Sequence, residues 1–209
     1  MKEKEIWKNA NETDSHLRYG KHIEKNINIL NDLFYLSNTP KAEINNVLDW
    51  GPGGGWLSKE VGGKKLFLFD VVKKHEKVQR KNCENRFDQI DFYDVAGEKY
   101  PDLDHKIDLA MVFSVYYHMP SLQYVKNAIE KLRSYKPTFI AIRNMFTDGE
   151  SWECDKFTNE NILRMNIFNV NEFLSLFPDY EVVSESKKET SNKLHSIECF
   201  SKSFILKRS

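Results

Sequence analysis

Short, uninterrupted apolar segments alternate with amphipathic helical segments along most of the chain. A strand that is apolar throughout is buried on both faces, and helices between such strands connect them in parallel. The sequence therefore predicts an α/β fold: a Rossmann-like, doubly wound sheet that is mostly parallel, with helices on both faces and an antiparallel pair of strands at its C-terminal edge. The expected strands are 46–49, 66–69, 87–90, 107–113, 138–142, 180–183 and 204–206, and the expected helices are 22–35, 56–61, 72–82, 122–132 and 170–177.

The length of 209 residues, of which 40% are hydrophobic, suits one domain with a sizeable core. We expect a single domain over 1–209, in which residues 1–40 form an N-terminal cap and helix and residues 42–206 form the core of the sheet. Residues 147–168, between the fifth strand and the next helix, are expected to form a substrate lid. A solvated loop is the alternative interpretation of that segment.

Basic and acidic residues are equal in number, at 31 each, so the formal net charge is zero. This balance argues against broad electrostatic capture of nucleic acid or of an anionic membrane. The longest stretch without formal charge, 109–125, is too short to span a bilayer, and the first residues lack the apolar core of a signal peptide. Three well-separated cysteines disfavour a zinc site or a disulfide framework, so we expect a cytoplasmic protein.

A glycine-rich junction follows the first expected strand and reads Asp49-Trp50-Gly51-Pro52-Gly53-Gly54-Gly55. Glycine lets the backbone turn sharply and approach a ligand closely, and the next helix begins with unpaired N–H groups. A plain turn is the alternative for this loop taken alone. Asp70 ends the second strand, 21 residues after Asp49. A carboxylate there can accept both ribose hydroxyls of a nucleoside, or it can cap the next helix.

Over roughly residues 42–206, the chain resembles the class I S-adenosylmethionine-dependent methyltransferases. The acidic strand end and the three alternate glycines match the family's first motif, and Asp70 matches its acidic residue after the second strand. Residues 89–92 look like the third-strand segment whose carboxylate meets the adenine amino group, although Asp88 and Asp94 compete with Asp91. The resemblance implies S-adenosyl-L-methionine as cofactor, held by Asp49, Gly51, Gly53, Gly55, Asp70, Asp91, Phe92, Ser114 and Tyr19.

The glycine spacing favours this cofactor over a nicotinamide dinucleotide. A pyrophosphate is best held by Gly-x-Gly-x-x-Gly at the start of a long helix. Here the glycines are two apart, and the helix expected behind them is short. Asp49 would sit poorly beside a pyrophosphate, whereas it suits the cationic amino group and sulfonium of S-adenosylmethionine.

His118 is the candidate catalytic base. Small-molecule methyltransferases often carry a histidine just before Met-Pro after the fourth strand, as His118 stands here. Methyl transfer depends mainly on alignment of the acceptor with the activated methyl group, and an oxygen or nitrogen acceptor also loses a proton that histidine can take. A structural histidine is the alternative. The candidate substrate-binding residues are Tyr117, Arg143, Asn144 and Trp152, with packing or solvated loop positions as their alternatives.

We expect a small-molecule acceptor that is methylated on an oxygen or nitrogen atom, with a sugar or a natural-product intermediate as candidates. The alternatives are an RNA or protein methyltransferase and a non-catalytic Rossmann module that binds a nucleoside. The lack of a basic block and of an Asn/Asp-Pro-Pro-Tyr motif argues against the first. No metal is expected, because Ser114 stands where metal-dependent catechol-type relatives have Asp. Residues 7–19, Tyr19 included, are expected to fold over the cofactor as a cap, with a disordered or surface-docked terminus as the alternative.

Overall fold

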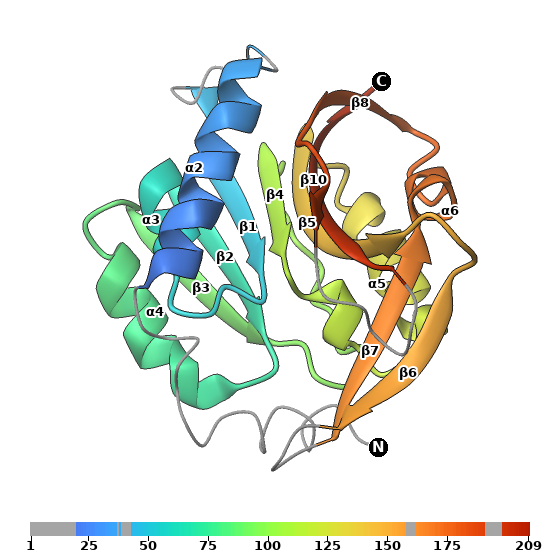
Figure 1. The fold of residues 1–209 in the computed structure, drawn as a ribbon. Helices are drawn as coiled ribbons and strands as arrows, with labels where there is room; N and C mark the ends of the chain where they lie inside the picture. Colours follow the sequence, from blue (N-terminus) through green and yellow to red (C-terminus); the bar gives the residue numbers. More distant parts are fainter. Residues whose placement is uncertain (1–19, 37, 39–42, 158–161, 191–197) are drawn as a thin grey trace.

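The computed structural model describes residues 20–36, 38, 43–157, 162–190 and 198–209. Figure 1 shows a twisted central sheet with helices packed against it. The helices are α2 (Lys21–Leu36), α3 (Trp56–Val61), η4 (Lys73–His75), α4 (Glu76–Cys83), η5 (Tyr116–His118), α5 (Leu122–Ser134) and α6 (Val170–Ser175), where η4 and η5 are 3-10 helices. The strands are β1 (Asn46–Trp50), β2 (Lys65–Asp70), β3 (Gln89–Asp94), β4 (Leu109–Phe113), β5 (Phe139–Thr147), β6 (Trp152–Phe157), β7 (Ile162–Asn169), β8 (Tyr180–Glu185), β9 (Glu189–Thr190) and β10 (Phe200–Arg208).

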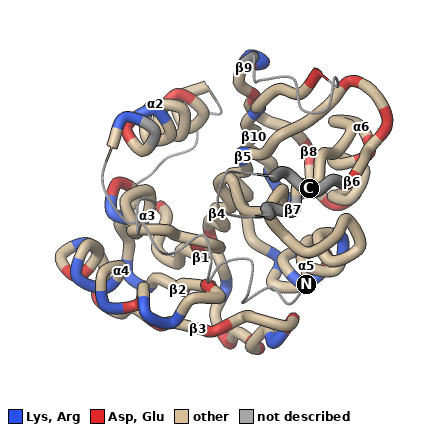
Figure 2. The backbone as a smooth tube through the Cα atoms, turned by 60° about the horizontal axis from the view of Figure 1, so that its bottom comes forward, with Lys and Arg blue, Asp and Glu red and all other residues tan. Residues whose placement is uncertain are grey.

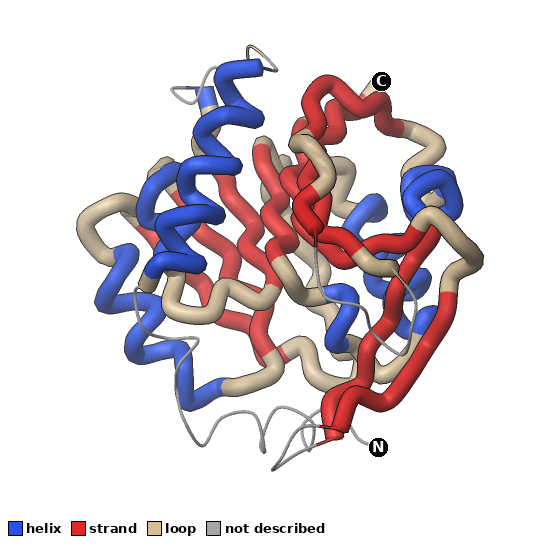
Figure 3. Tube along the Cα trace, viewed as in Figure 1, coloured by secondary structure: helices blue, strands red, loops and turns tan. Residues whose placement is uncertain are grey.

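The main path through the sheet has the order β3-β2-β1-β4-β5-β10-β8. Neighbouring strands from β3 to β5 are parallel, whereas β10 runs antiparallel to both β5 and β8. Figure 3 shows how these strands form one continuous layer between the helices. The strand order reverses between β1 and β4, which is the point where ligands of such sheets bind. The predicted mostly parallel sheet with an antiparallel C-terminal pair is confirmed.

Helices cover both faces of the sheet, as the alternating pattern predicts. Alternate residues of a strand point to opposite faces, so each strand contributes to two separate cores. The core on one face joins α2, α3 and α4 to the strands through Leu30, Leu57, Cys83, Leu66, Leu68 and Met111. The core on the other face joins α5 and α6 to the strands through Ile129, Phe173, Phe67, Ile142, Phe146 and Phe204.

The segment expected as a lid has regular structure in the residues that the structure describes. Strands β6 and β7 pair antiparallel, and the end of β7 pairs in parallel with β5 through Phe146–Phe168 and Thr147–Asn169. Asn169 then caps α6 as predicted, because its Oδ1 accepts from the N–H groups of Asn171 at 2.9 Å and Glu172 at 3.2 Å. The described part of this segment is therefore a hairpin and not a solvated loop, whereas its role as a substrate lid stays a prediction. The sequence analysis missed the hairpin because its strands lack the clean apolar runs on which the strand predictions rest.

Strand β5 continues beyond its expected end at residue 142 and runs to Thr147. Arg143 and Asn144, which the sequence places in the loop after the strand, consequently lie inside it. Their backbone pairs with β10, at Ser203 and Lys202 respectively. Ladder hydrogen bonds depend on the backbone and not on side-chain polarity, so two polar residues end an apolar run without ending the strand.

Acidic and basic residues are interspersed along the chain (Figure 2), and α4 carries the basic residues Lys77, Arg80 and Lys81. Within the described ranges, no helix is long and apolar enough to cross a bilayer.

Gly63 joins α3 to β2 at a place where no side chain fits. Its φ is +148°, and a Cβ there would lie 2.7 Å from the carbonyl oxygen of Asn45. Gly97 has φ +70° but nothing within 4 Å of its Cβ position. We expect Gly63→Ala to lower the free energy of unfolding by about 2–4 kcal/mol and Gly97→Ala by about 1 kcal/mol, measured by urea denaturation. Equal losses would contradict the steric argument.

Candidate active site

A cavity of about 560 Å³ opens at the carboxyl ends of β1, β2, β4 and β5. Its wall is built from α2, the glycine-rich loop, the end of β2, η5, β5 and β10. Of the residues selected from the sequence, those that line it are Asp49, Gly51, Gly53, Asp70, Ser114, Tyr117, His118, Arg143 and Asn144. Gly55, Asp91, Phe92 and Trp152 are not part of the lining, and Tyr19 lies outside the described residues.

The loops after β1 and β4 approach each other closely at the floor of the cavity. Gly51 has φ +70°, and a Cβ on it would lie 2.4 Å from a methyl carbon of Val115. Ser114, which directly follows β4, has φ 60° although it is not glycine, and such strain in a non-glycine residue is concentrated at functional sites. Gly55 has φ 77° as the N-cap of α3, so it shapes the loop from behind instead of lining the cavity.

Asp49 is a buried carboxylate at the end of the central strand, with only 3% of its surface exposed. The Ser58 hydroxyl on α3 donates to its Oδ2 at 2.5 Å. Burial raises the pKa of Asp49 to about 7; the Ser58 hydrogen bond opposes that rise, and the nearby Asp70 carboxylate adds to it. Ser58 is a site residue that the sequence interpretation missed. Its position on the buried side of the short helix after the glycine-rich loop was the available signal.

Asp70 lies at the edge of the cavity and also holds the turn that precedes η4. Its Oδ1 accepts from the N–H of Val72 at 3.0 Å, at the N-cap of η4, and its side chain also lines the cavity. Its Oδ2 accepts from Gln79 Nε2 at 2.6 Å and lies 3.6 Å from His75 Nδ1. Gln79 and His75, both buried, were not selected from the sequence, because neither belongs to a recognisable motif.

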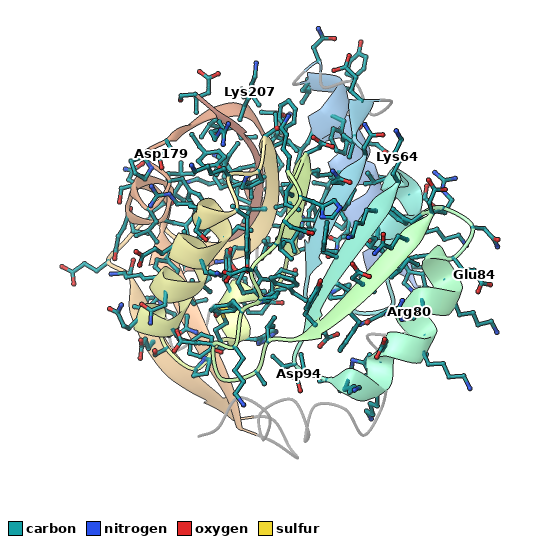
Figure 4. The ribbon with its side chains drawn as sticks, turned by 180° about the vertical axis from the view of Figure 1, so that it is seen from behind. Lys64, Arg80, Glu84, Asp94, Asp179 and Lys207 are labelled. Carbon is teal, nitrogen blue, oxygen red and sulfur yellow. The ribbon has the colours of Figure 1, made fainter. Side chains whose placement is uncertain are left out.

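The structure places Asp91 and Phe92 away from the cavity. Asp91 is paired in register with Phe67 in the middle of β2, whereas Asp94 is level with Asp70 at the strand end. At about 3.3 Å per residue, Asp91 is therefore about 10 Å short of the edge. It pairs with Lys65 at 3.2 Å, and Phe92 packs against the apolar core under α2 and α3. Figure 4 shows Asp94 at the end of β3, and the next residue, Val95, lines the cavity.

His118 and Tyr117 lie on η5 after β4, and their ring centroids are 3.9 Å apart. Burial raises the pKa of Tyr117, while a hydrogen bond with Ser114 and the charge of Arg143 oppose the rise. Trp152 packs with Tyr117 and Met145 against a small apolar cluster next to η5. Trp152 therefore supports one side of the site without reaching the cavity.

Two cations line the cavity at the β5 side and share one carboxylate. Arg143 donates from both terminal nitrogens to Glu189 on β9, at 3.1 and 3.0 Å, and Lys25 on α2 lies 2.5 Å from the same carboxylate. These partners hold the pKa of Glu189 at about 2, with the Arg143 hydrogen bond as the largest cause. Asn144 is also buried in the wall, and its Oδ1 has no hydrogen-bond partner among the residues that the structure describes.

Within the described ranges, no group of three or more histidine, cysteine, aspartate or glutamate side chains is arranged to hold a metal ion.

No protein-family model and no curated protein matches the chain. Solved structures match it over most of its length. The N-methyltransferase NodS from Bradyrhizobium japonicum, in complex with S-adenosyl-L-homocysteine, has a TM-score of 0.63 at 12% identity, with 97% of this chain and 96% of that one covered. An S-adenosylmethionine-dependent methyltransferase from Clostridium acetobutylicum gives 0.61 at 8% identity, with 88% and 90% covered. The [4+2]-cyclase SpnF gives 0.61 at 10% identity, with 87% and 80% covered. The chain therefore has the Rossmann-like fold of the S-adenosylmethionine-dependent methyltransferases, as its resemblance to them implies.

Proposed function

We propose that this protein binds S-adenosylmethionine and transfers its methyl group to an oxygen or nitrogen atom of a small-molecule acceptor. The observation that carries the proposal is the convergence of Asp49, Gly51, Gly53 and Asp70 on one cavity at the switch point of a methyltransferase fold. NodS, which shares the fold, is an N-methyltransferase with S-adenosyl-L-homocysteine bound.

The residues of the cavity fit the parts of this cofactor. Asp70 and the segment at Asp94 and Val95 stand where two adjacent strands end, and they suit the ribose and the adenine. Asp49 is a buried carboxylate whose charged form is disfavoured by burial. A ligand with a cationic amino group and a sulfonium favours that charged form, whereas a pyrophosphate would repel it. The fit of Asp49 therefore supports S-adenosylmethionine over a dinucleotide.

The acceptor would lie between η5 and β5, because the strands on the other side of the switch point serve the cofactor. When bound, S-adenosylmethionine supplies a methyl group activated by its sulfonium. The acceptor's lone pair would take up this methyl group, and His118 would accept the proton that the acceptor loses. Tyr117, Arg143 and Asn144 line this end and orient the acceptor; Trp152 acts through its packing with Tyr117.

The first test is binding. Calorimetry should give micromolar affinity for S-adenosyl-L-homocysteine, about 8 kcal/mol. Asp70→Ala should lose about 2–4 kcal/mol of that affinity, because ribose hydroxyls would be left unpaired. Asp91→Ala is the matched control and should bind normally, since Asp91 lies mid-strand beside Lys65. Tight binding of NAD with no binding of S-adenosyl-L-homocysteine would overturn the proposal.

The second prediction concerns the protonation of Asp49. In the unliganded protein its pKa is about 7, and a cationic ligand lowers it, so binding releases a proton. Affinity for S-adenosylmethionine should rise as the pH increases from 5.5 towards 7 and then level off. Asp49→Asn should abolish this slope and bind more weakly. The neutral analogue 5′-methylthioadenosine, which lacks the amino group, should show no slope in the wild type; a slope as steep as that of S-adenosylmethionine would exclude Asp49 as its source.

The protonation of Asp49 also changes the stability of the fold, and the direction of this change follows from its raised pKa. Its folded-state pKa lies above the ordinary value of 3.8, so the folded state binds the proton more tightly than the unfolded state does. The contribution of Asp49 to stability is therefore present below about pH 4 and is lost as the pH rises towards 7. Unliganded Asp49→Asn should melt at a higher temperature than the wild type at pH 8. A lower melting temperature at that pH would argue that Asp49 is structural.

The role of His118 as a base can be tested by substitution. If it takes the acceptor's proton, His118→Ala should lower the turnover number by roughly 10²–10⁴-fold with cofactor affinity unchanged. The wild-type rate should also fall in acid, because protonated imidazole cannot act as a base. His105→Ala, a histidine outside the cavity lining, is the control. Acceptors would be found by screening for release of S-adenosyl-L-homocysteine. Near-normal turnover of a folded His118→Ala variant would leave positioning alone as the mechanism.

A further inference from the structure

Helix α4 holds the glycine-rich loop from behind. The carbonyl oxygens of Gly53, Gly54 and Gly55 each accept a hydrogen bond from a side chain of this helix. In that order, the donors are Gln79 Nε2 at 3.0 Å, Asn82 Nδ2 at 2.8 Å and Cys83 Sγ at 3.3 Å. The conformation of the loop after β1 is therefore set by side chains that follow β2 in the sequence.

Gln79 also reaches the second half of the cavity. The same Nε2 atom that donates to Gly53 donates to Oδ2 of Asp70 at 2.6 Å. Gly53 and Asp70 both line the cavity, while Gln79 has no exposed surface and is not part of the lining. One buried amide thus joins the loop after β1 to the carboxylate at the end of β2.

The chemistry of the two partners determines how this amide is oriented. A carbonyl and a carboxylate can only accept hydrogen bonds, so the NH₂ group must face them both. The Oε1 atom then points elsewhere and is buried without a partner among the described residues. A buried, unsatisfied carbonyl costs stability. An apolar side chain would fill the position without that cost, which indicates a role beyond packing.

We propose that Gln79 is a positioning residue for the cofactor, which orients the Asp70 carboxylate towards the ribose and holds the glycine-rich loop in place. A carboxylate has about four lone-pair sites. The N–H of Val72 uses one on Oδ1, and Gln79 uses one on Oδ2, while His75 Nδ1 lies 3.6 Å from Oδ2, beyond hydrogen-bond distance. Two sites remain, which matches the two hydroxyls of a ribose. This inference rests on the proposed function, because it assigns Gln79 to the same cofactor.

The test compares Gln79→Met with Asn82→Leu. Both variants remove one hydrogen bond to the loop, but only Gln79 also contacts Asp70. Calorimetry would measure S-adenosyl-L-homocysteine and its 2′-deoxy analogue. For Gln79→Met we expect roughly 10–100-fold weaker binding of the parent compound and a loss of the preference for it over the analogue. Asn82→Leu should keep that preference. Melting temperatures of the unliganded variants should stay within a few degrees of the wild type.

A double-mutant cycle separates positioning from a merely structural role. In an Asp70→Ala background, Gln79→Met should weaken binding less than threefold, because the carboxylate that it orients is gone and only the hydrogen bond to Gly53 is left to lose. An undiminished loss in that background, or wild-type affinity and ribose preference in Gln79→Met itself, would overturn the inference. If Gln79→Met does not fold, Gln79→Asn provides the same comparison, since its shorter amide cannot reach both partners. A wild-type protein that does not bind S-adenosyl-L-homocysteine would overturn the proposed function, and this inference with it.

Discussion

The central strand β1 pairs in parallel with β2 on one side and β4 on the other, and the site depends on this double pairing. The loops that leave β1 and β4 must diverge to opposite faces, so a crevice opens between them. They still touch at its floor, where Gly51 meets Val115 at a distance that excludes any Cβ. The cavity exists because two adjacent parallel strands end at the same edge and a glycine lets their loops pass.

Burying a charged carboxylate at this edge of the sheet costs the fold stability. Asp49 is held by a single described side-chain donor, Ser58, and burial keeps its pKa near 7. Replacing this carboxylate would make the unliganded protein more stable above neutral pH, whereas a cationic ligand would recover the electrostatic cost. Gln79 lies behind the cavity wall and shows the same kind of cost, because its side-chain carbonyl is buried without a hydrogen-bond partner in the described structure. Such local conflicts with stability are concentrated at functional sites.

Under the proposed function, the cofactor end and the acceptor end of the cavity are built from different parts of the chain. The cofactor end uses loops that directly follow β1 and β2 and are close in sequence. The proposed acceptor end brings together Arg143 of β5 and Glu189 of β9, which are 46 residues apart in the sequence, with Lys25 of α2, which precedes both by more than a hundred residues. The hairpin of β6 and β7 supports η5 from outside, where Asn166 Nδ2 donates to the carbonyl oxygen of Met119 at 2.5 Å.

The sequence by itself determined the fold class, the cofactor-side motif and most of the elements. Apolar runs and helical spacing depend on local burial, and the match is close for α3, which spans the expected 56–61. The sequence did not determine where β5 ends. Backbone pairing with β10 extends this strand through the polar residues Arg143 and Asn144, which no apolar pattern marks as part of a strand. The sequence also could not decide between Asp91 and Asp94, since only the register against β2 shows which of them reaches the edge. The hydrogen bonds of Ser58 and Gln79 were likewise decided by tertiary structure alone, because they join residues that no local pattern relates to their partners.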